Sequence, residues 1–137
     1  MGFQDLSEGW RDRPVSDPHV MADVVDLFVS EQSRHCGALY LLFCDEQNRV
    51  ALPMVFDDVD VGQPEDCRER LVPILAMVGQ RLPGGSVVAA LGRRGLPRVT
   101  AVDLEWMAGV RDACERVQTR LLGFYVAVPD GILNGMP

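Results

Sequence analysis

The sequence predicts a single α/β domain built on a mixed β-sheet flanked by helices. Short and almost wholly apolar runs at Ala38 to Cys44, Val50 to Phe56 and Ser86 to Leu91 are typical of strands. Stretches with a helical spacing of apolar residues separate these runs, and the chain of 137 residues has the length of one ordinary domain. The order helix, hairpin, helix, strand, helix, strand favours a sheet with both parallel and antiparallel neighbours.

The composition is that of a globular protein, with 47% hydrophobic and 24% charged residues. No apolar run approaches the roughly 20 residues that span a bilayer. The stretch from Met1 to Pro18 is too polar and acidic for a signal peptide, so we expect a cytoplasmic protein. The net charge of −7 disfavours a general nucleic-acid-binding role, because it repels phosphate backbones.

The cysteine pattern predicts buried, reduced thiols and no cofactor. The four cysteines are scattered along the chain: Cys36, Cys44, Cys67 and Cys114. They form no Cys-x-x-Cys pair, and no histidine lies at zinc-finger spacing from them. This pattern therefore indicates neither a zinc knuckle nor a redox pair.

Residues 1–17 are expected to form an N-terminal arm, followed by a helix from Pro18 to about Glu31. Asp17 can cap this helix, and proline suits its first position. One face of the helix is apolar, with Val20, Val24, Leu27 and Phe28. The arm carries three apolar side chains that could dock on a surface, which are Phe3, Leu6 and Trp10.

The first two apolar runs are expected to form a β-hairpin with largely buried strands. A polar turn from Asp45 to Asn48 joins the two runs, as in a short hairpin loop. Asp57, Asp58 and Asp60 follow the second strand. They lack the defined loop of a calcium site, so they predict a solvated turn or strand end.

A second helix is expected from about Pro64 to Leu82. Its apolar stripe has helical spacing and comprises Cys67, Leu71, Leu75, Val78 and Leu82. Pro73 lies inside this pattern. It should kink or divide the helix, because proline removes a backbone donor and clashes with the preceding turn.

The last helix is expected to begin with a capping box and to continue to about Thr119. Thr100-Ala101-Val102-Asp103 spells that box with Asp in place of Glu. The inner stripe of the helix comprises Met107, Val110, Cys114, Val117 and Leu121, with Trp106 off that face. A strand from Leu121 to Val128 completes a domain of residues 18–128, and residues 129–137 are expected to be a loose tail.

The loop between the third strand and the last helix is the candidate functional stretch, because ligands in α/β folds bind at strand ends. Arg93, Arg94 and Arg98 lie beside Gly92 and Gly95, just ahead of a helix N-terminus. Guanidinium groups, flexible backbone and a helix dipole together can bind phosphate or carboxylate. The alternative is a mobile surface loop whose arginines offset acidic surroundings.

This stretch resembles the motif of the JAB/MPN metallohydrolases, and within them the bacterial RadC-like branch. That motif is His-x-His-Pro, six residues, Ser, two residues and Asp. Here the same spacing runs from Ala90-Leu91-Gly92-Arg93, over six residues, to Thr100 and then Asp103. Thr100 stands at the serine position and Asp103 at the aspartate position.

Other segments carry the same resemblance. Arg68-Glu69, followed by Leu71 and Pro73, is similar to the family's Pro-Arg-Glu-x-x-x-Pro helix. The hairpin from Leu39 to Phe56 and the run Leu121 to Phe124 fall where the family has strands. The resemblance covers about Pro18 to Val128, and it implies the JAB/MPN architecture, which is cytidine-deaminase-like.

The resemblance also implies a lost metal site. In the family, two histidines and the aspartate hold Zn²⁺, and a glutamate on the second strand takes a proton from the metal-bound water. Ala90 and Gly92 carry no donor atom, and Pro53 to Val55 has no acid. Asp103 alone is too little to hold zinc. His19 and His35 lie outside the motif, in a helix start and in a polar loop.

Three functions follow as expectations, in order of preference. The first is a non-catalytic pseudoenzyme domain, without a cofactor, that acts through protein contacts as a dimer or as one part of a complex. The alternative is a binding protein or enzyme for a small phosphate-bearing molecule such as a nucleotide, using Arg93, Arg94 and Arg98 with Asp103. A zinc-dependent hydrolase is the third and least favoured interpretation.

Overall fold

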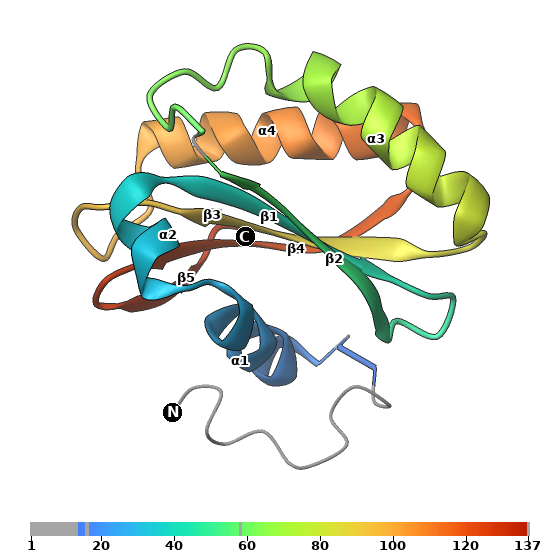
Figure 1. Ribbon diagram of the computed structural model, residues 1–137, viewed down its shortest axis with the longest axis horizontal. Coiled ribbons are helices and arrows are strands. Elements are labelled where there is room, and N and C mark those ends of the chain that lie inside the picture. The colour runs from blue at the N-terminus through green and yellow to red at the C-terminus, as the bar shows by residue number, and fades with distance from the viewer. Residues whose placement is uncertain (1–13, 16, 58, 137) are drawn as a thin grey trace.

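The computed structural model describes residues 14–15, 17–57 and 59–136 (Figure 1). Its helices are α1 (Pro18–Phe28), α2 (Glu31–Cys36), α3 (Cys67–Arg81) and α4 (Ala101–Arg116). Its strands are β1 (Ala38–Cys44), β2 (Val50–Asp57), β3 (Ser86–Gly92), β4 (Arg120–Val128) and β5 (Gly131–Asn134). The apolar side chains predicted in the N-terminal arm, Phe3, Leu6 and Trp10, lie outside the described residues, as does Asp58.

The strands form one five-stranded mixed sheet in the order β2-β1-β3-β4-β5, which confirms the predicted α/β class. β3 and β4 are parallel and are connected through α4, while the other neighbours are antiparallel. α3 and α4 cover one face of the sheet, and α1 lies against the other (Figure 1). None of the described helices has the length and apolar character that crossing a membrane requires.

The core has two halves, one on each face of the sheet, because alternate strand residues point to opposite faces. Leu39, Leu41 and Phe43 of β1 pack with the inner stripes of α3 and α4. Tyr40 and Leu42 pack with the buried face of α1, which includes Met21, Val24 and Val25. The central strands β1 and β3 are buried along their whole length, as their continuous apolar runs predict.

The first helix is shorter than predicted. α1 ends at Phe28, because Val29 takes an extended conformation. Ser30 then caps the new helix α2 by accepting a hydrogen bond from the Ser33 backbone N–H. His35, which was predicted in a loop, therefore lies in the last turn of α2. A serine between two helical segments is the signal for this break.

The prediction of two buried hairpin strands is wrong for β2. Its side chains are exposed or half-buried throughout, because β2 lies at the edge of the sheet and has a neighbouring strand on one side only. Pro53 fits this position, since a strand proline cannot donate to a second neighbour. A proline in an exposed edge also discourages pairing with another chain.

The predicted loose tail is also wrong in part. Residues 131–134 form β5, which pairs antiparallel with β4. Gly131 has a φ of 155° and follows Pro129 and Asp130, so a tight turn directs the chain back along β4. A run of four residues is too short to show the alternating pattern of a strand. β5 is held in place by its antiparallel pairing with β4.

α3 accommodates Pro73 without being divided into two helices. It begins at Cys67, three residues after Pro64, and includes Pro73 in its interior. Pro73 removes the hydrogen bond that the Glu69 carbonyl would accept. Both residues are exposed, so water can satisfy that carbonyl.

Trp106 is buried, contrary to the prediction that it lies off the inner face of the last helix. α4 packs on α3 and on the segment after β2 as well as on the sheet, so it has a wider buried face than one stripe. The indole Nε1 of Trp106 donates a 2.7 Å hydrogen bond to the Val61 carbonyl. Trp106 thereby attaches the segment after β2 to α4.

Candidate functional site

The loop between β3 and α4 is organised by Arg93, the first residue after the strand. Its guanidinium Nε donates to Oδ1 of Asp103 at 2.7 Å, and Nη2 donates to Oδ2 at 2.7 Å. This is a two-pronged ion pair, the strong geometry for arginine and carboxylate. The Asp103 side chain is only 1% exposed and that of Arg93 only 9%, so the pair is shielded from water.

The remaining donors of Arg93 hold the loop itself. Nη1 donates to the carbonyls of Arg94 and Leu96, and Nη2 donates to the carbonyl of Arg98 at 2.8 Å. Gly95 allows the loop to pass this close to the guanidinium. Its φ of 116° favours glycine, and a Cβ there would lie only 2.9 Å from Nη1 of Arg93. One guanidinium therefore ties the whole loop to the start of α4.

Asp103 also completes the predicted capping box. Its Oδ2 accepts a hydrogen bond from the Thr100 backbone N–H at 2.8 Å, and the Thr100 hydroxyl accepts one from the Asp103 N–H at 3.3 Å. Burial acts to raise the pKa of Asp103, but the hydrogen bonds and charge of Arg93 and the bond from Thr100 outweigh it. The pKa of Asp103 is therefore lowered, and the carboxylate is charged at neutral pH.

Ala90 and Gly92 face the layer of α1 and α2, not the start of α4. Ala90 is fully buried in the core half that packs on α1. A Cβ built on Gly92 would lie 3.0 Å from the Ser33 carbonyl oxygen and 3.4 Å from Val29. The backbone of α2 thus occupies the space that a side chain at position 92 would need.

The other two arginines of the loop, Arg94 and Arg98, are exposed. The structure shows no side-chain hydrogen bond for either within the described part of the chain. Since the donors of Arg93 are used inside the molecule, an anion site would depend on Arg94 and Arg98. Binding of phosphate or carboxylate at this loop stays a prediction.

His35 and Cys36 line a surface pocket together with Arg93 and Arg94 of this loop, whereas the other cysteines are buried. Cys44, Cys67 and Cys114 are free and buried, and burial raises the pKa of the first two to about 11 and of Cys114 to about 12. Cys36 is exposed, contrary to expectation, because it ends the short helix α2 at the surface. Among residues 14–15, 17–57 and 59–136, no three His, Cys, Asp or Glu side chains are placed to share a metal ion.

The ion pair between Arg93 and Asp103 was not predicted from the sequence. Asp103 was predicted as the acid of the capping box, at the aspartate position of the motif, and in the alternative function as a neighbour of the three arginines around a ligand. Arg93 was grouped with the other arginines as a candidate anion ligand. The sequence does contain one indication that Arg93 is buried. Arg93 directly follows a strand that is buried along its length, so its backbone lies close to the core. Its ten-residue separation from Asp103 gives no periodic pattern by which to recognise the pair.

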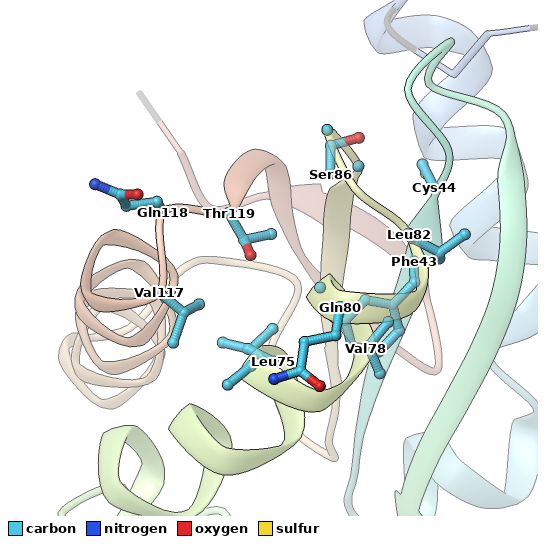
Figure 2. A pocket seen from close by; sticks show the side chains of 14 residues that line it. Phe43, Cys44, Leu75, Val78, Gln80, Leu82, Ser86, Val117, Gln118 and Thr119 are labelled. Carbon is cyan, nitrogen blue, oxygen red and sulfur yellow. The ribbon is translucent and has the colours of Figure 1, made fainter.

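A second feature lies at the opposite end of β3, where a pocket of about 370 Å³ opens between the ends of α3 and α4. Figure 2 shows its walls, formed by Leu75 and Val78 of α3, Val117 after α4, and Phe43 of β1. The hydroxyl of Thr119 lies toward the cavity, while Gln118 points away from it (Figure 2). This pocket was not predicted from the sequence, because it depends on how the two helices end.

No protein-family model matches this chain, and no curated protein matches it. Candidate roles for the loop and the pocket therefore rest on their own residues and geometry.

Proposed function

We propose that this chain is a non-catalytic, metal-free domain of the JAB/MPN type that acts through protein contacts. Apart from the additional helix α2, the order of its elements from α1 to β4 is the one predicted from the sequence pattern. The observation that carries the proposal is the two-pronged ion pair between Arg93 and Asp103. In the resemblance, Asp103 stands where the family has a metal-binding aspartate.

Arg93 supplies Asp103 with the positive charge that a metal ion would supply in an active relative. Both carboxylate oxygens already accept hydrogen bonds from the guanidinium, and Oδ2 accepts a further one from Thr100. A zinc ion would have to displace this buried partner and then find other donors. Ala90 and Gly92 offer none, and both face a different layer of the fold.

Exposed apolar side chains near the loop support a role in protein contacts. Leu96 is 61% exposed, Val99 36% and Leu104 46%, and the three lie within nine residues of the chain. We call this set the loop patch. Burial of such exposed apolar side chains against a partner is favourable. Self-association through the loop patch is the form of contact that we propose.

The double variant Leu96→Asp/Leu104→Asp is expected to weaken self-association at least about 30-fold, since burying one leucine contributes about 1.5–3 kcal/mol. Sedimentation velocity over a range of concentrations measures this as a shift from dimer to monomer. Met77→Asp is the control, because Met77 is 52% exposed on α3 and lies outside the loop patch. A wild-type protein that stays monomeric at hundreds of micromolar would refute self-association, and equal weakening by Met77→Asp would refute the loop patch.

A further inference from the structure

We propose that a second pocket, enclosed by β2, α3 and the segment that joins them, binds a free α-amino acid with a large apolar side chain. This pocket has a volume of about 370 Å³, which admits a ligand of that size. None of the loop-patch residues lines it. The proposal therefore does not rest on the proposed function, and either can fail alone.

The body of this pocket is apolar. The indole Nε1 of Trp106 already donates to the Val61 carbonyl, so the ring offers only carbon atoms to a ligand. Walls of this kind favour an apolar group and provide few partners for a buried polar one. They combine side chains from the sheet with side chains from α3 and α4, and these are Leu39, Phe56, Leu71, Ile74 and Trp106.

Charges of both signs lie at the rim of the pocket. The lining includes Asp60, Asp66 and Arg70, and all three residues are exposed. Arg70 follows Asp66 by one helical turn, a spacing at which aspartate and arginine commonly form an ion pair. They form none here, and Asp66, the N-cap residue of α3, makes no side-chain capping bond. Within the described ranges of the chain, both charged groups are thus free to bind a ligand.

The spacing of these charges suits a zwitterion. Cβ atoms one helical turn apart are about 5–6 Å from each other, so a small group that carries both charges can lie between the two side chains. The ligand ammonium would donate to Asp66, and the ligand carboxylate would accept from the Arg70 guanidinium. Asp60 adds to the ammonium half, because its Oδ1 accepts from the Gly62 N–H and its Oδ2 is left for the ligand. The apolar side chain of the amino acid then extends into the body of the pocket.

The test is a titration of the ¹⁵N-labelled protein with L-phenylalanine, followed by the amide shifts of Gln63, Asp66, Arg70 and Ile74. We expect saturable shifts with a Kd of about 1 mM, a reasonable value for so small a ligand. L-Alanine is expected to bind at least about ten-fold more weakly, because its methyl group leaves most of the apolar body empty.

Two analogues of L-phenylalanine test the need for both charges. 2-Phenylethylammonium lacks the carboxylate and faces Arg70 without a partner for it. 3-Phenylpropanoate lacks the ammonium and faces the carboxylates of Asp60 and Asp66. Each is expected to bind at least about five-fold more weakly than L-phenylalanine, since each loses one charge-assisted contact and meets a like charge.

Two variants assign the charges to their residues. Arg70→Gln is expected to weaken L-phenylalanine binding at least about five-fold without weakening 2-phenylethylammonium. Asp66→Asn is expected to weaken L-phenylalanine to a similar extent without weakening 3-phenylpropanoate. Asp112→Asn is the control, because Asp112 is an exposed aspartate of α4 outside the pocket, and it should change none of these affinities.

Three results would overturn the proposal. The first is the absence of saturable shifts with L-phenylalanine. The second is binding of either single-charge analogue as tightly as L-phenylalanine. The third is a loss of affinity in Arg70→Gln and Asp66→Asn that is the same for both analogues, since the two residues would then not bind opposite ends of the ligand.

Discussion

Replacing Arg93 with alanine is expected to lower the free energy of unfolding by about 3–5 kcal/mol, the usual effect of removing one partner from a buried ion pair. The variant leaves the Asp103 carboxylate buried with only the Thr100 N–H as a donor. It also removes the bonds that hold the carbonyls of Arg94, Leu96 and Arg98. Urea denaturation followed by circular dichroism measures the loss.

Arg94→Ala is the matched control, because it removes an exposed arginine from the same loop. We expect it to change the free energy of unfolding by no more than about 0.5 kcal/mol. If Arg93→Ala were as mild as Arg94→Ala, the ion pair would not hold the loop in solution.

The same pair makes the stability depend on acid. The pKa of Asp103 is lower in the folded protein than in the unfolded chain. Its contribution is therefore present in full above the unfolded pKa, which is about 3.9, and is lost as the pH falls through the folded value. The gap in unfolding free energy between the wild type and Arg93→Ala should thus be widest near neutral pH and narrow below about pH 4. A gap that stays constant down to pH 2 would contradict a charged pair.

Replacing Gly92 with histidine, the residue of the family motif, is expected to cost about 3 kcal/mol or more of unfolding free energy. Even a Cβ at position 92 lies 3.0 Å from the Ser33 carbonyl, and the imidazole would have to displace α2. Overpacking of this kind is destabilising by about 1–3 kcal/mol, and a buried imidazole without a hydrogen-bond partner adds to that.

Gly62→His controls for the introduction of a histidine, since a Cβ at this exposed glycine meets only Asp60, at 3.5 Å. Its expected effect is within about 0.5 kcal/mol. Thermal and urea unfolding of the two variants give the comparison. A Gly92→His protein as stable as Gly62→His would show that position 92 has room for a metal ligand after all.

The elements best predicted from the sequence are those with strong local signals. β1 and β3 are continuous apolar runs because each has neighbours on both sides and helices on both faces, which leaves little place for polar residues. The start of α4 was predicted to the residue, because a capping box is a local pattern of side-chain and backbone bonds.

The features that the sequence did not predict depend on contacts between distant segments. Trp106 is buried by the segment that carries Val61, and β5 is ordered by β4. Arg93 has a structural role because its guanidinium donates to the carboxylate of Asp103, ten residues later in the chain. In the sequence the three loop arginines cannot be told apart. In the structure Arg93 is buried, whereas Arg94 and Arg98 are exposed.

The most direct test of a metal-free domain is elemental analysis of protein purified without a metal-affinity tag, chelator or added metal. The wild type, Arg93→Ala and Asp103→Ala should all contain zinc well below one equivalent per chain, because no group of three metal-donor side chains includes Asp103 in the described part of the chain. One equivalent of zinc in the wild type, lost in Asp103→Ala, would contradict the proposed function and identify Asp103 as a metal ligand.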